Sequence, residues 1–170
     1  MAGDRSNPRV QVATVSADGV PALRTVVLRG LLGDGTPYFT TDARSRKVDH
    51  LDSKPPFLAM LAWFESTRQQ FRLSGLASVH REHAAAPWDT LRVALWSRLS
   101  PEERTPFFGP APGRHLVDAP RVEKPEVLPT SFVLVSLAVE EVDWLVLGSP
   151  HHRASFRKVG STWLNQRVTP

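Results

Sequence analysis

Residues 39–51, FTTDARSRKVDHL, gather basic side chains at the point where a strand is expected to lead into a helix. Free backbone N–H groups at a helix start favour an anion, and Arg46 and Lys47 would add positive charge there. The hydroxyls of Thr40 and Thr41 stand just before them. Because basic residues are otherwise unfavourable at a helix N-terminus, the segment predicts an anion site. A solvated basic turn is the alternative.

Two arginines interrupt the apolar segment LRTVVLRG, residues 23–30. Strand alternation places Arg24 and Arg29 on opposite faces unless the strand bulges. A buried, unpaired guanidinium is costly, so each arginine should meet an anion or solvent. These positions therefore predict contact with an anion on at least one face of the strand. The alternative is that one or both arginines lie on a solvent-exposed face.

Four further side chains are weaker candidates. Gln70, at the entry to a strand, carries the donor and acceptor groups that a heterocycle edge requires. Trp144 would stack on a flat ligand or fill the core. His151 and Arg153, in the expected loop 148–153, suit a substrate contact or a plain surface loop. No metal is expected, because adjacent histidines rarely reach one ion and the chain has no cysteine.

Length and composition indicate a single globular domain, residues 1–170, with net charge +4 and pI near 10.1. A basic pocket for a phosphorylated small molecule explains this charge as well as nucleic acid does, and no basic block favours nucleic acid. No apolar run is long enough for a membrane span. The absence of cysteine fits the cytoplasm. No phosphate loop, G-x-G-x-x-G motif or G-x-S-x-G elbow occurs.

The elements that must position these residues are mostly strands. Alternation and turn signals predict strands at 10–16, 21–32, 38–41, 57–65, 70–80 and 131–147, the last bent at Glu140–Glu141, and a closing hairpin around Gly160. Helical spacing is found at 44–53 and 82–99, with a short helix after Pro101. The proline-rich residues 105–130 are expected to form an ordered surface loop that is long enough to suspect a function. The fold class is mainly β: a closed antiparallel barrel with inserted helices.

In this order, the segments resemble the pyridoxamine 5'-phosphate oxidase-like flavoproteins of the FMN-binding split barrel. The resemblance runs nearly end to end, through NPRVQVATVSADGVPALRTVVLRG, YFTTDARSRKVDHL, RQQFRLSG, LPTSFVLVSLAVEEVDWL and the final Trp163 and Pro170. It implies an antiparallel split barrel of six or seven strands with two or three helices. It also implies a homodimer with noncovalent FMN at the interface between the two chains.

The resemblance assigns roles residue by residue. The implied cofactor-binding residues are Arg24, Thr25, Val26, Val27, Leu28, Arg29, Thr40, Thr41, Arg46, Lys47, Gln70 and Trp144, and the implied substrate contacts are Arg29, His151 and Arg153. Arg24, Arg46, Lys47 and Thr41 would hold the phosphate. No side chain is expected to act as a nucleophile, and no catalytic residue is assigned.

The implied activity is that of an FMN-dependent oxidoreductase acting on a small molecule that the sequence does not identify. Arg29 stands where pyridoxamine 5'-phosphate oxidases have a lysine, Ser155 stands near their last flavin-contacting arginine, and residues 82–129 match their substrate-phosphate residues poorly. The alternatives are a true pyridoxamine or pyridoxine 5'-phosphate oxidase, a noncatalytic flavin- or haem-related binding module, a nucleic-acid binder, and a deazaflavin in place of FMN.

Overall fold

The computed structural model describes residues 8–53, 55–114 and 127–170. The strands in these ranges are β1 (Arg9–Val15), β2 (Pro21–Leu31), β3 (Pro37–Asp42), β4 (Phe57–Phe64), β5 (Gln69–His80), β6 (Phe132–Val146), β7 (His152–Val159) and β8 (Thr162–Arg167). The α-helices are α1 (Arg46–Asp52), α2 (Trp88–Ser97) and α3 (Pro101–Arg104), and short 3-10 turns cover η1 (Glu65–Thr67) and η2 (Thr105–Phe107).

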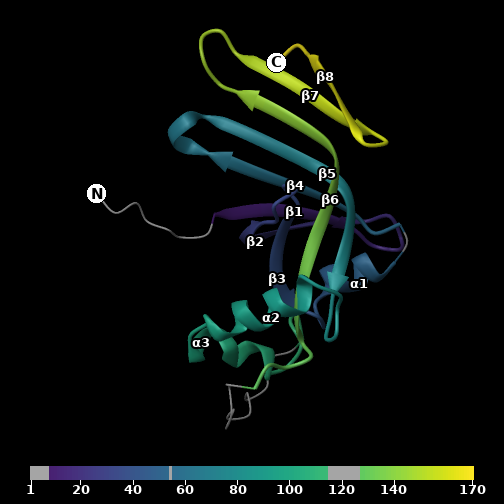
Figure 1. Ribbon diagram of the computed structural model, residues 1–170, viewed down its shortest axis with the longest axis vertical. Coiled ribbons are helices and arrows are strands. Elements are labelled where there is room, and N and C mark those ends of the chain that lie inside the picture. Colours follow the sequence, from purple (N-terminus) through teal and green to yellow (C-terminus); the bar gives the residue numbers. More distant parts are fainter. Residues whose placement is uncertain (1–7, 54, 115–126) are drawn as a thin grey trace.

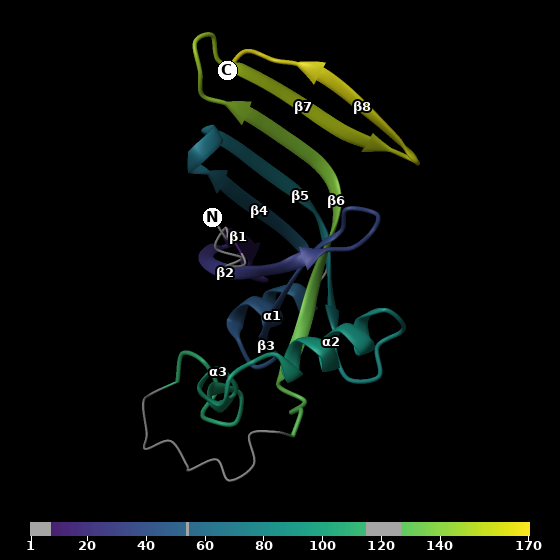
Figure 2. The same ribbon diagram turned by 60° about the vertical axis from the view of Figure 1, so that its left-hand side comes forward.

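The eight strands form one antiparallel sheet in the order β3-β2-β1-β4-β5-β6-β7-β8. A further pairing of β3 with β6 closes the first six strands into a barrel. The hairpin β7–β8 extends the sheet beyond the barrel and lies at the opposite end of the molecule from α2 and α3 (Figures 1 and 2). The predicted fold class, a mainly antiparallel β-barrel with inserted helices, is confirmed.

Alternation along the strands builds the barrel interior. Val10 and Val12 on β1 are fully buried, and Leu58 and Met60 on β4 point to the same interior. Phe57, on the outward face of β4, is 55% exposed. Because successive side chains of a strand point to opposite faces, the strands separate a buried interior from an outer face that still carries apolar side chains.

Helices cover two parts of this barrel. α1 packs against β1 and β5, and its Leu51 joins the interior cluster. α2 packs outside β6, where Trp96 contacts Phe132 at a ring distance of 5.1 Å. The buried Arg92 side chain anchors α2 by donating from Nε to the Phe132 carbonyl at 2.7 Å and from Nη2 to the Pro129 carbonyl at 2.8 Å.

A β-bulge interrupts the β5–β6 ladder at Glu140. Ser74 pairs with Glu141 and Gly75 pairs with Val139, so Glu140 is an extra residue on β6. A Cβ at position 75 would collide with the Ala138 carbonyl oxygen, which explains the glycine. The bend predicted at Glu140–Glu141 is therefore a bulge within one continuous strand.

Two boundary predictions are wrong, and a third region is described only in part. Residues 82–87 form turns rather than the start of a helix, with His83 at φ 59°, and α2 begins only after Pro87. Arg153 lies in β7 and not in a loop, because it pairs across the ladder with Leu145. In the proline-rich region, residues 105–107 form a 3-10 turn and residues 115–126 lie outside the described residues.

Candidate functional site

Arg24 is held at the edge of the barrel interior. It pairs with Val12 in the β1–β2 register and shares the inward face of that residue. Its Nη1 donates to the Thr14 hydroxyl at 2.8 Å and to the Val12 carbonyl at 3.3 Å. Thr14 is also hydrogen-bonded to Nδ1 of His50 on α1 at 3.0 Å, and both residues are buried. The Arg24 guanidinium is thereby tied to both β1 and α1.

The start of α1 brings two more cations to the same place. Nζ of Lys47 donates to the Thr41 hydroxyl at 2.8 Å and to the Ser45 hydroxyl at 3.0 Å. Arg46 is exposed and makes no hydrogen bond or ion pair within the described ranges. α1 has only seven residues, so the positive charge here comes from side chains more than from a helix dipole. We call Arg24, Arg46 and Lys47, with the hydroxyls of Thr14 and Thr41, the cationic cradle.

The cations of the cradle repel one another. Burial, and then the charge of Arg24, lowers the pKa of Lys47 below its ordinary value of 10.5. Burial, and then the charge of Arg46, lowers the pKa of Arg24. Like charges brought together in a partly desolvated space raise the energy of the free protein. An anion at this place would relieve that repulsion.

Asp42, the acid whose charge acts on Lys47, already has an ion-pair partner. Arg44 binds the carboxylate of Asp42 with two side-chain hydrogen bonds, Nε to Oδ1 at 3.0 Å and Nη2 to Oδ2 at 2.7 Å. The Arg44 backbone N–H adds a third bond at 2.7 Å. Hydrogen bonding to Asp42 raises the pKa of Arg44. Lys47 is consequently paired with hydroxyls and not with a carboxylate.

Arg29 and Thr40 form a separate contact. The β2–β3 register shifts between Leu28 and Gly30, and Nε of Arg29 donates to the Thr40 hydroxyl at 3.1 Å. Thr41 faces Lys47, so the two adjacent threonines serve different partners. The predicted placement of Arg24 and Arg29 on opposite faces agrees with these contacts.

Gln70 and Trp144 lie away from the cradle on β5 and β6. The Trp144 ring stacks on Phe71 with centroids 6.3 Å apart, and its Nε1 donates to Oε1 of Gln69 at 2.9 Å. The neighbouring glutamine therefore makes the contact with Trp144. Gln70 pairs with Trp63 on one side and Leu145 on the other, on the opposite face of β5.

Arg153 belongs to an ion-pair network on β5, β6 and β7. Asp143 accepts hydrogen bonds from Arg153 and Arg72, with closest distances of 2.7 Å and 2.8 Å. These bonds, that of Arg153 first, lower the pKa of Asp143. His151 is exposed, and its Nδ1 accepts from the Gly148 N–H at 3.1 Å. The structure does not bring either residue into the cradle.

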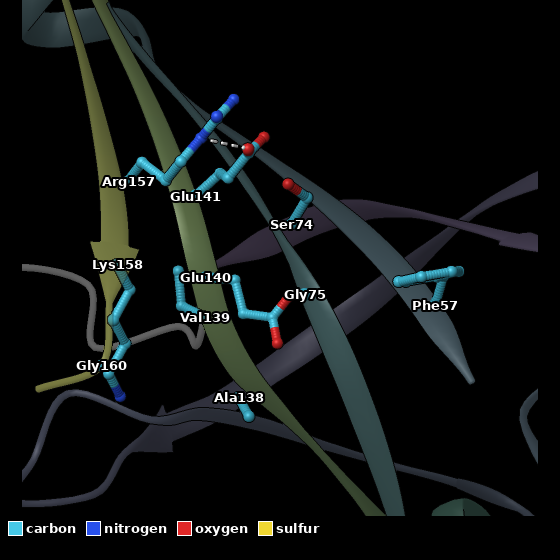
Figure 3. A pocket seen from close by; sticks show the side chains of 10 residues that line it. All are labelled: Phe57, Ser74, Gly75, Ala138, Val139, Glu140, Glu141, Arg157, Lys158 and Gly160. Atoms are coloured by element: carbon cyan, nitrogen blue, oxygen red, sulfur yellow. Dashed lines mark ion pairs between the residues drawn. The ribbon is translucent and has the colours of Figure 1, made fainter. Parts of the chain in front are cut away.

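Two hollows lie elsewhere on the surface. One, of about 740 Å³, follows the β-bulge, and its lining includes Phe57, Glu140 and the ion pair of Glu141 with Arg157 at 2.9 Å (Figure 3). The other, of about 660 Å³, is mainly apolar and is lined by side chains that include Phe71. Neither lining includes a cation of the cradle.

Several residues around the cradle were not anticipated from the sequence. They are Thr14 and His50, which are linked to Arg24, Ser45, which binds Lys47, and Asp42 and Arg44, which bind each other. Within the described ranges, no three histidine or acidic side chains gather as a metal site would require, and no helix is long and apolar enough to cross a membrane.

Comparison with known proteins bears on this arrangement. A family model described as the FMN-binding domain of pyridoxamine 5'-phosphate oxidase matches residues 2–81, which include every residue of the cradle. The pyridoxine/pyridoxamine 5'-phosphate oxidase 2 of Arabidopsis thaliana is 30% identical over 175 residues, which is 95% of this chain and 86% of that protein. The chain belongs to the pyridoxamine 5'-phosphate oxidase-like family of FMN-binding proteins.

Two solved structures have the same barrel. A pyridoxamine 5'-phosphate oxidase-related, FMN-binding protein from Nostoc punctiforme superimposes with a TM-score of 0.85 and is 30% identical, over 98% of this chain and 90% of that one. PhzG from Burkholderia lata, solved with tetrahydrophenazine-1-carboxylic acid, gives a TM-score of 0.73 at 21% identity, over 98% and 84% of the two chains, and so shows the fold alone. The resemblance read from the sequence is thus confirmed at the level of family and fold.

Proposed function

We propose that this protein binds FMN through the cationic cradle and acts as a flavin-dependent oxidoreductase on a small molecule. The observation that supports this proposal is that Arg24 and Lys47, each held by a hydrogen bond to a threonine hydroxyl, converge with the exposed Arg46 at the start of α1. A phosphate monoester carries about two negative charges near neutrality and accepts several hydrogen bonds. FMN ends in such a group.

The residues present fit the cofactor. Arg24 and Lys47 would hold the phosphate with Thr41, and Arg46 would add charge from the solvent side. The backbone of residues 25–28 would lie along the ring. Bound FMN supplies two-electron redox chemistry, and the chain supplies position, charge and exclusion of water.

A homodimer is part of the proposal. The outer face of β2, β1, β4 and β5 exposes apolar side chains, including Leu23 at 71%, Phe57 at 55% and Trp63 at 39%. Exposed apolar surface of this kind marks interaction sites. Two copies of the face, related by a two-fold axis along the strands, would place β2 of one chain against β5 of the other. Gln70, which shares this outer face with its register partner Trp63, would then complete the flavin site of the opposite chain.

Riboflavin, which lacks the phosphate, gives the sharpest test. Purified protein should retain flavin absorbance after FMN is added and the mixture is desalted. It should also bind FMN more tightly than riboflavin in a fluorescence-quenching titration. The double variant Arg24→Ala/Lys47→Ala should lose this preference and retain the fold by circular dichroism. Unchanged FMN affinity in that variant would overturn the proposal, and sedimentation as a monomer would overturn the dimer.

The substrate contacts in the proposal are Arg29 and, from the β7 region, His151 and Arg153. Arg29 uses its Nε on Thr40, whereas Arg153 is held by Asp143, so Arg29 has more donors free for an anionic substrate. The name and 30% identity of the Arabidopsis relative favour a second candidate, a pyridoxamine 5'-phosphate oxidase. Hydrogen peroxide production from pyridoxamine 5'-phosphate by the FMN-loaded protein would establish that candidate. Bound FMN without turnover of any donor would indicate a noncatalytic flavin-binding protein.

A further inference from the structure

Asp42 is the acidic side chain whose charge acts on Lys47, and Arg44 is its partner. We propose that Arg44 is a positioning residue that masks the Asp42 carboxylate and so keeps Lys47 available for an anion. The inference rests on the proposed role of the cationic cradle. It concerns a residue that itself points away from the cradle, toward residues 107–109.

The geometry of the Asp42–Arg44 pair accounts for the masking. The guanidinium binds both carboxylate oxygens, at 3.0 Å and 2.7 Å, in the two-pronged geometry that only arginine offers. The Arg44 backbone N–H binds Oδ1 as well. The side chain of Asp42 is only 9% exposed, so solvent does little to screen the charge that Arg44 neutralises.

Lys47 shows the result of this masking. Its ammonium has three N–H donors, and two of them bind the neutral hydroxyls of Thr41 and Ser45. The Ser45 hydroxyl in turn donates to the Asp42 backbone carbonyl at 2.7 Å, and not to the carboxylate. The attraction of Asp42 opposes the lowering of the Lys47 pKa, so the acid is near enough to matter. One ammonium donor is left for an incoming anion.

Arg44 is fixed from its other side by the chain after α3. Its Nη1 donates to the Gly109 carbonyl at 2.8 Å and its Nη2 to the Phe107 carbonyl at 3.2 Å. The Ser131 hydroxyl holds the same Phe107 carbonyl at 2.7 Å. Residues 107–109 therefore keep the guanidinium of Arg44 bound to Asp42. While this contact is made, Arg44 offsets the negative charge of Asp42, and Lys47 experiences less of that charge.

Removing the guanidinium has a predictable effect on the cradle. In Arg44→Gln, the Asp42 carboxylate loses its partner and pairs with Lys47. Asp42 then competes with the phosphate group for the Lys47 ammonium. We expect the Kd for FMN to rise about five- to tenfold, the range that follows from losing about 1 to 1.4 kcal/mol. The Kd for riboflavin should not change. Inorganic phosphate should also protect the variant less than the wild type in a thermal-shift assay.

Two double variants identify the cause. Asp42→Asn/Arg44→Gln has the net charge of the wild type and lacks the Arg44 bonds to residues 107–109, and we expect it to bind FMN like the wild type. The second is Lys47→Met/Arg44→Gln, whose Kd for FMN should equal that of Lys47→Met alone. Without the Lys47 ammonium, the unmasked Asp42 has no cation of this site to pair with. Circular dichroism and thermal melting of each variant verify the fold.

The outcomes separate this inference from the proposed function. If wild-type protein does not prefer FMN to riboflavin, the cradle itself is not a phosphate site. If the wild type does prefer FMN but Arg44→Gln binds FMN equally well, only the masking role is overturned. A loss that persists in Asp42→Asn/Arg44→Gln assigns the effect to the contact with residues 107–109. If Arg44→Gln lowers FMN affinity by the same factor in Lys47→Met as in the wild type, the effect comes from the positive charge of Arg44 itself. This result and the preceding one both contradict masking.

Discussion

Thr14 holds the guanidinium of Arg24, and Thr14→Val tests whether that contact matters for binding. The substitution keeps the shape of the side chain and removes the hydroxyl that accepts from Arg24 at 2.8 Å and contacts His50 at 3.0 Å. Thr14 is 1% exposed and His50 is 8% exposed, so no solvent replaces the lost partner. A buried polar atom left without a partner costs about 1–3 kcal/mol of stability. The free protein should therefore be destabilised by about that amount in urea.

The effect on the ligand is a separate quantity. Arg24 would keep only its 3.3 Å bond to the Val12 carbonyl, and its guanidinium would lose its fixed direction. Because Arg24 is partly exposed, we take about 1 kcal/mol for the lost contact, which raises the Kd for FMN about fivefold. Fluorescence quenching well below the melting temperature measures this change, with riboflavin as the ligand that should not respond.

Thr162→Val is the matched control. Thr162 begins the exposed strand β8, so the same chemical change should alter neither stability nor FMN affinity. If Thr14→Val is destabilised while its Kd for FMN equals that of the wild type, Thr14 supports the fold but does not position Arg24. If neither quantity changes, the Arg24–Thr14–His50 contacts do not form in solution.

Two further predictions concern a ligand and a glycine. The pKa of Lys47 is lowered from 10.5, and bound phosphate favours its charged form. FMN affinity should accordingly be complete below that lowered pKa and fall as pH rises through it. Titrations from about pH 7.5 to about pH 10 measure this fall; Lys47→Met should flatten the profile, and a constant wild-type affinity would contradict the assignment. Gly75→Ala should lose about 3 kcal/mol or more in urea unfolding, because the new methyl group meets the Ala138 carbonyl oxygen and lies 3.0 Å from the Glu140 nitrogen. Gly33→Ala, with nothing within 4 Å, should be nearly neutral, and equal stability of the two variants would refute the bulge argument.

Much of the barrel could be predicted from the sequence, because its strands alternate and its turns carry glycine. The positions of Arg24, Arg46 and Lys47 followed from residue type and from the strand-to-helix pattern. The prediction places the start of α2 too early, because residues 82–86 have the composition of a helix. The left-handed backbone conformation of His83, which the composition does not indicate, makes this segment a turn. Arg153 was misplaced because a strand edge and a loop have similar composition when half the side chains are exposed.

The supports of the cradle depend on information that a local pattern does not contain. Val12 is the register partner of Arg24, and Thr14 lies two residues further along the same face of β1, within reach of the guanidinium. Register depends on both paired strands, so neither segment alone predicts this contact. His50 reaches Thr14 because α1 packs on β1. Arg44 finds its carbonyl partners at residues 107 and 109, more than sixty positions along the chain.

The closing pair of the barrel has a consequence for biosynthesis. Every cation of the cradle lies within the first 47 residues, yet β3, which carries Thr41, pairs with β6 through partners such as Thr41 with Val133. Contacts this distant in sequence form late, because the loop between them must first be closed. When only the first hundred residues have left the ribosome, the side chains of the cradle are therefore present without β6, the strand that pairs with β3. Acquisition of the proposed cofactor should therefore follow the emergence of β6 from the ribosome.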